Sequence, residues 1–358
     1  MPAKFDQAKA EAFAQKLLDM LNAGGLALMT SLGHRTGLFD AMKNLPPSTS
    51  QEIAAAAGLN ERYVREWLGA MVVGRVVDYE PEEGRYHLPP EHAAFLTREA
   101  APDNIAAFAQ YIGTMGGVED QIVECFKHGG GVPYSAFPHF HHVMAEDSGQ
   151  TVVAALIDHI LPLVEGLSER LRAGIEVMDV GCGSGRALNL LAQTFPASRF
   201  TGYDFSDEAI GYAKAQAEEL GLSNVDFVVR DVTGMACGPT FDLITAFDAI
   251  HDQASPDRVL AGIHGCLRDD GVFLMQDIAA SSRLEKNLDH PVGVLLYALS
   301  TMHCMTVSLA QGGMGLGTMW GEEKAREMLA QAGFAEVVTK KLPHDFQNNF
   351  YIIRKQPG

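Results

Sequence analysis

Cysteine is scarce in this sequence of 358 residues, which has five cysteines, no C-x-x-C pair and one cysteine left over from any even pairing. We therefore interpret all five as reduced thiols of a cytoplasmic protein. Residues 1–21 also lack the uninterrupted apolar run of a signal peptide, because Asp, Glu and Lys are mixed among their apolar positions. Export is not expected.

Basic residues are few as well, since 27 Lys and Arg stand against 45 Asp and Glu, for a net charge of −18. Such a charge repels phosphate backbones and anionic lipid headgroups, so we expect neither nucleic acid nor a membrane as a partner. Residues 291–321 contain no Asp, Glu, Lys or Arg, but His303, Gln311 and several glycines interrupt them. They cannot supply about 20 consecutive apolar residues, and we expect them to be buried inside the protein.

The composition that remains is that of a folded protein, with 47% hydrophobic and 20% charged residues. Its first 98 residues have the pattern of a winged helix. Apolar residues recur at helical spacing in four segments, 5–22, 27–42, 49–58 and 60–73. Gly58 suits a left-handed helix end and Asn60 suits an N-cap. Short strand-like runs on both sides of the turn EPEEG then predict a hairpin.

A winged helix can read DNA, but the charge of this one argues against that role. The helix that would enter a major groove carries Glu61 and Glu66 beside its two arginines, and the hairpin carries three glutamates. A DNA-binding domain is normally basic on its contacting face. We therefore expect residues 1–98 to have a structural or dimerising role.

The rest of the sequence divides into a helical segment and an α/β domain. Residues 99–172 are mostly helical, with a break at HGGGVPYSAFPHF, and we interpret them as a linker and substrate lid. Over residues 173–358, strand-like runs alternate with helical ones, which predicts a parallel sheet with helices on both faces. Residues 281–321 form an insertion after the strand GVFLMQDI.

A glycine-rich turn, GCGSG, follows the first strand of this α/β domain. Gly181, Gly183 and Gly185 allow the backbone to approach a ligand closely at the carboxyl edge of the sheet. A dinucleotide-binding turn would have another glycine where this chain has Arg186, so a nicotinamide oxidoreductase is disfavoured. Asp179, just before the turn, could hold an amino group through hydrogen bonds.

Acidic residues end the next two strands. Asp204 follows Gly181 at the distance at which an acid can bind both hydroxyls of a ribose. Asp231 ends the third strand, where it can accept a hydrogen bond from an adenine amino group. One such acid is often only a helix cap, but three around a glycine turn indicate a binding site.

At these residues the chain resembles the class I S-adenosylmethionine-dependent methyltransferases, with VMDVGCGSG as the first family motif. The whole chain is similar to methyltransferases with an N-terminal winged-helix domain, including a mycobacterial group and small-molecule O-methyltransferases. The resemblance implies a Rossmann-like domain with a seven-stranded, mostly parallel sheet, S-adenosylmethionine as cofactor, S-adenosylhomocysteine as product, and a homodimer formed by the N-terminal domain. The resemblance also implies cofactor contacts by Gly181, Gly183, Asp204, Phe205, Asp231, Val232 and Phe247, to which we add Asp179, Cys182 and Gly185 from the glycine turn.

Methyl transfer needs a nucleophile placed in line with the methyl group and, where required, a base. His251 and Asp252 follow the fourth strand and resemble the HDW motif of O-methyltransferases, whose histidine is a general base. Gln253 replaces the tryptophan of that motif. We assign His251 and Asp252 as catalytic, and a helix cap or a packing role beneath the cofactor stays open for His251.

Two other regions supply candidate substrate residues. The insertion contains His303, Trp320 and several methionines that could line an apolar pocket, although methionines at this spacing more often belong to a core. The lid contains Tyr134, His139 and His142. Histidine is a common zinc ligand, but matching acids or cysteines are missing at ligand spacing, so we expect no metal.

These observations predict a cytoplasmic enzyme that methylates a small molecule on O, N or S. The alternative is a transcription regulator that senses S-adenosylmethionine and reads DNA with the winged helix, which the acidic helix disfavours.

Overall fold

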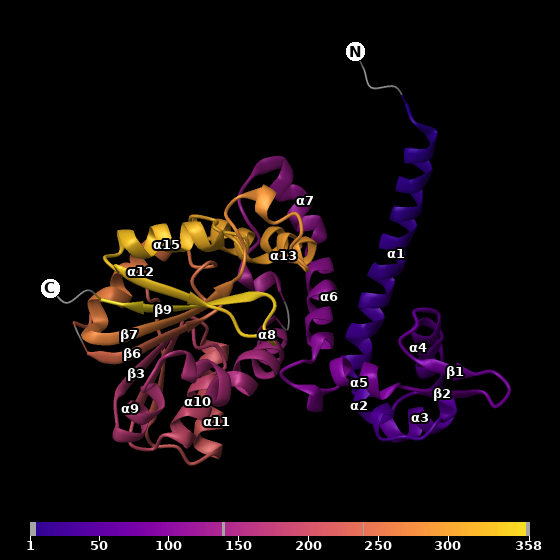
Figure 1. Cartoon of the computed structure of the whole chain (residues 1–358), viewed down its shortest axis with the longest axis horizontal. Helices are drawn as coiled ribbons and strands as arrows, with labels where there is room; N and C mark the ends of the chain where they lie inside the picture. Colours follow the sequence, from indigo (N-terminus) through magenta and orange to yellow (C-terminus); the bar gives the residue numbers. More distant parts are fainter. Residues whose placement is uncertain (1–4, 138–139, 239, 356–358) are drawn as a thin grey trace. The chain divides into compact units, whose positions relative to one another are not determined.

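Residues 5–137, 140–238 and 240–355 are described by the computed structural model, which divides into two units, Met1–Gly113 and Thr114–Gly358 (Figure 1). The first unit contains α1 (Gln7–Arg35), α2 (Leu38–Lys43), α3 (Ser50–Ala57), α4 (Glu61–Val73), β1 (Asp78–Glu80), β2 (Arg85–His87) and α5 (Pro90–Leu96). Two 3-10 helices, Arg98–Ala100 and Ile105–Ala109, follow them. The predicted order of helix, turn, helix and hairpin is confirmed.

α1 is one helix where the sequence pattern predicted two. It continues through Gly24 and Gly25 and ends at Arg35, and α2 begins after Gly37, whose φ is 73°. The predicted break was wrong because a glycine inside a helix costs only about 1 kcal/mol relative to alanine. The helical hydrogen bonds on both sides of the two glycines outweigh that cost.

α3 and α4 begin and end where the sequence predicts. Thr49 and Glu52 form a capping box at the start of α3, Gly58 ends it with a φ of 66°, and Asn60 caps α4. Trp67 of α4 donates from its indole Nε1 to the carbonyl of Met29, 2.8 Å away, and so attaches α1 to the winged helix. The buried core of this unit includes Leu38, Phe39, Met42, Ile53, Val64, Leu68 and Met71.

The second unit begins with helices and continues into a sheet. The helical part comprises the end of α6 (Gln110–Gly116), whose first residues belong to the first unit, and then α7 (Glu119–His128), α8 (Phe140–Ser148) and α9 (Leu167–Ala173). The sheet part comprises β3 (Glu176–Val180), α10 (Arg186–Thr194), β4 (Arg199–Asp204), α11 (Asp207–Glu219), β5 (Val225–Val229), β6 (Phe241–Phe247), α12 (Pro256–Cys266), β7 (Leu267–Ile278), α13 (Gly293–Leu299), α14 (Met305–Ala310), α15 (Gly321–Gln331), β8 (Glu336–Lys340) and β9 (Asn348–Arg354). 

The seven strands run in the order β5-β4-β3-β6-β7-β9-β8. All neighbours are parallel except β9, which is antiparallel to both β7 and β8. The order reverses between β3 and β6, and open α/β sheets bind ligands beside such a point at the carboxyl ends of the strands. The predicted fold class, a mostly parallel Rossmann-like sheet behind a winged helix, is confirmed.

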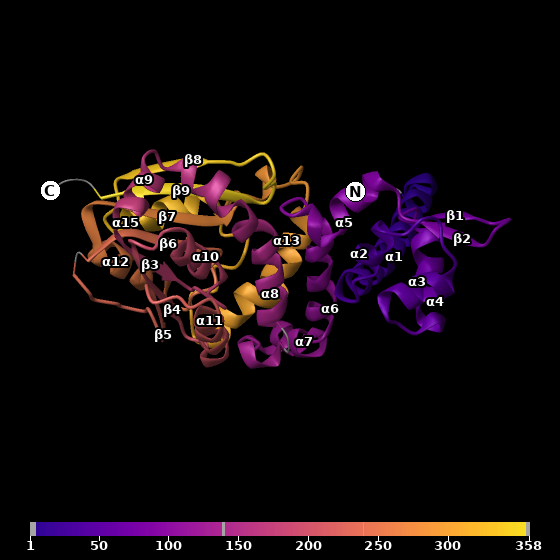
Figure 2. The same cartoon turned by 90° about the horizontal axis from the view of Figure 1, so that it is seen from below.

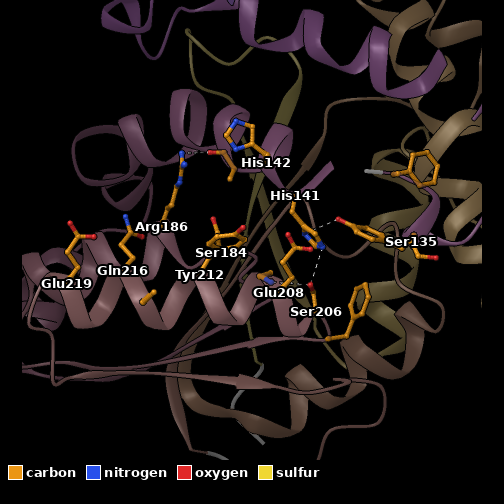
Figure 3. A pocket seen from close by; sticks show the side chains of 16 residues that line it. Ser135, His141, His142, Ser184, Arg186, Ser206, Glu208, Tyr212, Gln216 and Glu219 are labelled. Atoms are coloured by element: carbon orange, nitrogen blue, oxygen red, sulfur yellow. Dashed lines mark hydrogen bonds between the residues drawn. The ribbon is translucent and has the colours of Figure 1, made fainter. Parts of the chain in front are cut away.

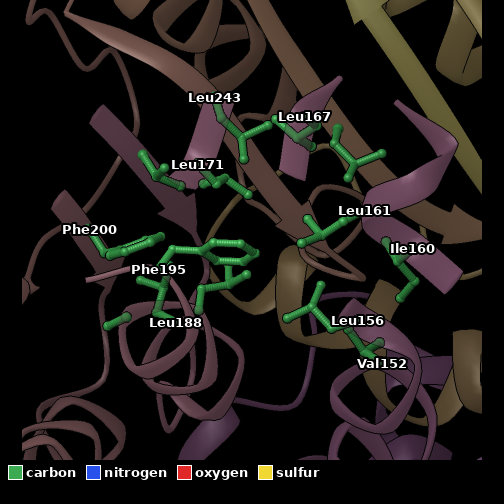
Figure 4. Close-up of a cluster of buried hydrophobic side chains, with 14 of the residues drawn as sticks. Val152, Leu156, Ile160, Leu161, Leu167, Leu171, Leu188, Phe195, Phe200 and Leu243 are labelled. Atoms are coloured by element: carbon green, nitrogen blue, oxygen red, sulfur yellow. The ribbon is translucent and has the colours of Figure 1, made fainter. Parts of the chain in front are cut away.

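Successive strand residues point to opposite faces of this sheet. Val177 and Leu243 pack in a cluster with α9 and α10 (Figure 4). Met178 and Ile244, one residue further along each strand, pack in a second cluster with α12 and α15. Helices therefore cover both faces, as Figure 2 also shows.

Two findings concern the cysteines and the apolar insertion. Cys237 and Cys266 form a disulfide, so the interpretation of all five cysteines as reduced thiols was wrong. The fold brings these two cysteines to a Cα–Cα distance of 5.2 Å although 29 residues separate them in sequence, a proximity that spacing alone cannot reveal. The stretch Gly293–Ala310 is long and apolar enough to cross a membrane by length and composition, and 39% of it is buried within the protein.

Candidate active site

A cavity of about 260 Å³ lies at the carboxyl ends of the central strands. Its lining includes most of the predicted cofactor residues, namely Gly181, Gly183, Asp204, Phe205, Asp231, Val232 and Phe247. A smaller adjoining cavity of about 90 Å³ is lined by Asp179, Cys182 and the same two glycines. Gly185 lines neither cavity. It starts α10 with a φ of 71°, and a Cβ there would come within 2.6 Å of Ala213 and Phe227.

The glycine turn is fixed by backbone hydrogen bonds to the neighbouring strand. The amides of Gly181 and Cys182 donate to the carbonyl of Tyr203, at 2.8 and 3.1 Å. The amide of Gly183 donates to Oδ2 of Asp204 at 2.9 Å, and the amide of Ser206 donates to Oδ1 of the same carboxylate at 2.9 Å. Asp204 therefore holds the turn and the start of α11 in one arrangement at the edge of the cavity.

Asp179 is buried beneath the turn. Thr245 of β6 donates its hydroxyl to Oδ1 of Asp179 at 2.6 Å. Burial raises the pKa of Asp179 to about 7, against a lowering effect of the Thr245 hydrogen bond, and the nearby Asp204 raises it further. A carboxylate in this state gains stability from a positively charged partner.

Asp231 lines the larger cavity. Its Oδ1 accepts a hydrogen bond from the amide of Thr233 at 2.8 Å, and its side chain is exposed. Beside it, the Arg230 guanidinium lies over the ring of Tyr203, 5.1 Å from the ring centre. Val232 is buried next to these residues and lines the same cavity.

His251 is buried and bound to a carboxylate that the sequence analysis did not single out. Its Nδ1 lies 3.0 Å from Oδ1 of Asp277 at the end of β7, and the same oxygen accepts from Trp320 Nε1 at 2.9 Å. His251 is 2% exposed and Asp277 is fully buried. Burial alone would lower the pKa of His251, but Asp277 and the neighbouring Cys304 raise it well above its usual range.

Asp248 and Asp252 flank His251 in the chain and line the larger cavity. Asp248 has a φ of 56°, in the left-handed region, and its Oδ1 lies 3.7 Å from Nδ1 of His251. Burial raises the pKa of both carboxyls, and the charge of His251 acts in the opposite direction on both. The pKa of Asp252 is raised to about 6. A non-glycine residue in this backbone region is uncommon and is often found at functional sites.

Asp248, His251 and Asp277 are also the one group among the described residues that could hold a metal ion, with ligand atoms within 4.8 Å of one another. Coordination through Nδ1 would require breaking the hydrogen bond between His251 and Asp277. The geometry therefore favours a histidine–carboxylate pair over a metal centre.

Aromatic side chains cover this end of the cavity. Phe140 stacks on His303 with ring centres 3.6 Å apart, and Tyr134 contacts His303 and Phe205 edge to face. Burial lowers the pKa of His303 to about 3, with smaller effects from nearby His251 and His141. Burial raises the pKa of Tyr134, as do Asp252 and Asp204.

The remaining predicted substrate residues lie in different places. Trp320 is 5% exposed in the core that packs with α12 and α15, where it supports Asp277 and lines neither cavity. His142 lines a separate groove of about 960 Å³ with Arg186 and Tyr212 (Figure 3). His139 lies outside the described residues.

His141 stands between that groove and the cofactor cavity, and it lines both. Its Nε2 lies 3.1 Å from the Ser206 hydroxyl and its Nδ1 lies 3.3 Å from the Tyr134 hydroxyl (Figure 3). The lid segment is thereby attached to the start of α11. The sequence contained a signal for this contact, the run FPHFHHVM, but not which histidine faces the site.

Two family models match the chain. Residues 24–98 match a Rv2258c-like winged HTH domain, and residues 171–338 match a methyltransferase domain. Both parts of the resemblance stated from the sequence are confirmed.

Individual relatives cover less of the chain. The (S)-coclaurine N-methyltransferase of Papaver somniferum is 29% identical over 109 residues, which are 30% of this chain and 31% of that protein. The trans-aconitate 2-methyltransferase of Acidovorax sp. strain JS42 is 28% identical over 174 residues, 48% of this chain and 63% of that protein. This chain thus spans less than two thirds of the length of these relatives.

Solved structures match the chain over nearly its whole length. Human N-acetylserotonin methyltransferase in complex with SAM superposes with a TM-score of 0.68 at 18% identity, covering 100% of both chains. At that identity the likeness establishes a shared fold.

Proposed function

We propose that this chain, whose residues 171–338 are a methyltransferase domain behind a winged HTH domain, transfers the methyl group of S-adenosylmethionine to a small molecule. The observation that supports this most is the set of acids around the glycine turn. Asp179, Asp204 and Asp231 come from three neighbouring strands and lie along two adjoining cavities. Their spacing suits the amino group, the ribose and the adenine of one nucleoside ligand.

The cavity fits that ligand. A Cβ on Gly183 would have no atom within 4 Å, so the turn leaves open space where Gly183 lines both cavities. Asp204 accepts ribose hydroxyls with the lone pairs that its two backbone donors leave free, while Phe205, Val232 and Phe247 pack against the base. Asp179 accepts from the amino group. The bound cofactor supplies an electrophilic methyl group on a sulfonium.

His251 acts as the base for an acceptor proton. Asp277 holds Nδ1, which fixes the orientation of the ring and leaves Nε2 as the atom that takes a proton. Burial excludes water from the pair. Asp252 lines the cavity beside it and belongs to the same catalytic group.

The remaining domains complete this proposal. Residues 1–98 form the dimer interface, 99–172 the linker and lid, and 173–358 the catalytic domain with a substrate-capping insertion at 281–321. The dimer is supported by apolar side chains on α1 that are 44% to 74% exposed: Phe13, Leu17, Leu18, Met20 and Leu21. Cytoplasmic location stays a prediction of the sequence.

The test is calorimetric titration of the purified chain with S-adenosylhomocysteine. We expect micromolar binding to the parent and loss of binding in Asp204→Ala. Asp226→Ala, an exposed acid in the adjacent strand β5, is the matched control and should bind like the parent. Absence of binding to a folded parent would contradict the proposal.

A further inference from the structure

Carboxylates gather at the acceptor end of the cavity, and the proposed function gives none of them a contact with the acceptor. Asp248 and Asp252 line the cavity there, and Asp277 lies behind His251. None of these three is needed by the nucleoside contacts assigned to Asp204 and its neighbours. Four groups affect the pKa of Asp248 besides burial, namely His251, Asp277, Asp147 and Asp252, so the carboxylates act on one another at short range.

The one positive charge among these carboxylates is that of His251, whose Nδ1 pairs with Asp277. Within the described lining of the larger cavity, the basic side chains are Arg230 and His141. Arg230 is stacked on Tyr203 beside Asp231, at the adenine end. His141 is engaged with the hydroxyls of Ser206 and Tyr134. His251 therefore offsets one of the three carboxylates, and no arginine or lysine of this lining offsets the other two.

Unsatisfied oxygens mark the same place. Oδ1 of Asp248 and Oδ2 of Asp277 are both buried without a hydrogen-bond partner, and Asp277 is fully buried. A buried acceptor without a hydrogen-bond partner costs free energy, and the cost is larger when the acceptor is charged. The lowest-cost way to satisfy such a group is a cation that donates hydrogen bonds into the cavity.

The other walls suit an organic cation with an aromatic part. Tyr134, Phe140, Met144 and Val307 line the cavity beside Asp248 and Asp252. Aromatic faces attract an ammonium group, and apolar side chains bind the carbon skeleton that carries it. Carboxylates and rings together thus recognise an arylalkylamine better than a phenol or a carboxylic acid.

We propose that the methyl acceptor is an arylalkylamine, bound as its ammonium ion by Asp248 and Asp252 and methylated on nitrogen. This inference rests on the proposed function. One ammonium proton passes to Nε2 of His251, the base of the proposed function, which frees the nitrogen lone pair. The lone pair forms the N–C bond to the methyl carbon as the C–S bond breaks, and the electrons of that bond stay on sulfur. The products are an N-methylammonium ion and S-adenosylhomocysteine, so charge and atoms balance.

The test uses three probes of one shape and different charge on the full chain saturated with S-adenosylhomocysteine. Tyramine is the cation, 4-ethylphenol the neutral analogue and 4-hydroxyphenylacetate the anion. A charged, partly buried hydrogen-bonded contact contributes about 1.5–3 kcal/mol, so tyramine should bind about 10- to 100-fold more tightly than 4-ethylphenol. The anion should bind most weakly.

Asp252→Asn and Asp248→Asn should each remove most of the preference for tyramine over 4-ethylphenol while affinity for S-adenosylhomocysteine stays. Asp226→Asn makes the same charge change outside the cavity and should keep the preference. With S-adenosylmethionine, mass spectrometry should find the new methyl group of tyramine on nitrogen. Because the parent alone gives the ranking of the three probes, a variant that fails to fold does not prevent a result.

Several outcomes would overturn the inference. They are equal or tighter binding of 4-ethylphenol or the acid, binding of none of the probes to the loaded chain, and methylation on the phenol oxygen. If the variants bind S-adenosylmethionine more weakly relative to S-adenosylhomocysteine and keep the preference for tyramine, the carboxylates contact the sulfonium of the cofactor instead. Loss of tyramine binding after chelation would assign them to a metal ion. If the parent does not bind S-adenosylhomocysteine at all, the proposed function fails first, and this inference fails with it.

Discussion

His251 shows how one buried contact sets the chemistry of a side chain. Asp277 stabilises the imidazolium, so the pKa of His251 lies well above its usual range even though burial opposes this. The resulting stability is fully present below the unfolded pKa of about 6.5 and is lost as pH rises through the folded pKa. A base of this kind is free to accept a proton only at alkaline pH, so we expect methyl transfer to increase with pH above neutrality.

Replacing Asp277 with Asn should therefore move the rising limb of the pH–rate profile to lower pH. A neighbouring opposite charge typically changes a pKa by about 1–3 units, and we expect the midpoint to fall by at least about one. The measurement is kcat/KM against pH for the parent, Asp277→Asn and the exposed control Asp226→Asn. A lower melting temperature with an unchanged profile would show that Asp277 is merely structural.

At the scale of elements, the turn between β3 and α10 depends on glycines for two different reasons. Gly183 has a φ of 52° and open space around a Cβ, whereas Gly185 has a φ of 71° and packs against the core. A left-handed non-glycine residue costs about 1–3 kcal/mol. At Gly185 the clash with Ala213 and Phe227 adds to that cost.

Gly183→Ala should lower the free energy of unfolding by only about 1–3 kcal/mol. It should nevertheless weaken the binding of S-adenosylhomocysteine strongly, because the new methyl group enters the cavity. Gly185→Ala should destabilise the domain more than Gly183→Ala does. Chemical denaturation and calorimetry on the two variants separate these effects. Equal loss of stability in both would contradict the difference in their surroundings.

Strand alternation was enough to predict this edge of the sheet, because parallel strands bring their carboxyl ends together. The rule that found Asp204 also applies to Asp277, which lies at the end of the strand GVFLMQDI. Its pairing with His251 was not predictable, because His251 follows the end of β6 by four residues and only the fold brings it to Asp277. Contacts of that kind, like the Cys237–Cys266 disulfide, depend on tertiary geometry that spacing does not carry.

At the scale of the whole molecule, charge distinguishes the proposed methyltransferase from a DNA-binding regulator. The arginines of α4 are already paired along the helix, Arg62 with Glu66 and Arg65 with Glu61. With a net charge of −18, we expect no salt-dependent binding to duplex DNA. Fluorescence anisotropy with labelled random-sequence duplex at 50 mM and 200 mM salt tests this. Tight binding that weakens steeply with salt would instead favour the transcription regulator.

Assembly is a second property of the whole chain. α1 has 29 residues, of which Ser31, Gly33 and His34 are buried, and its apolar side chains need a partner surface. We expect a dimer by light scattering, and Leu18→Lys with Leu21→Lys should yield a monomer because charged side chains do not stay in an apolar interface. Asn22→Lys, exposed on the same helix, is the control. A parent that is monomeric at micromolar concentration would contradict the assignment.

The stacked rings of Phe140 and His303 also govern the order of events in a catalytic cycle. Phe140 lines the cofactor cavity, and His303 lies near enough to His251, which is 2% exposed, for the charge of His251 to lower its pKa. We expect an acceptor to reach the base when the two rings part. Steady-state kinetics should accordingly follow a compulsory sequence in which the cofactor enters first, with a turnover number that falls as solvent viscosity rises because ring separation, not chemistry, is the slow step.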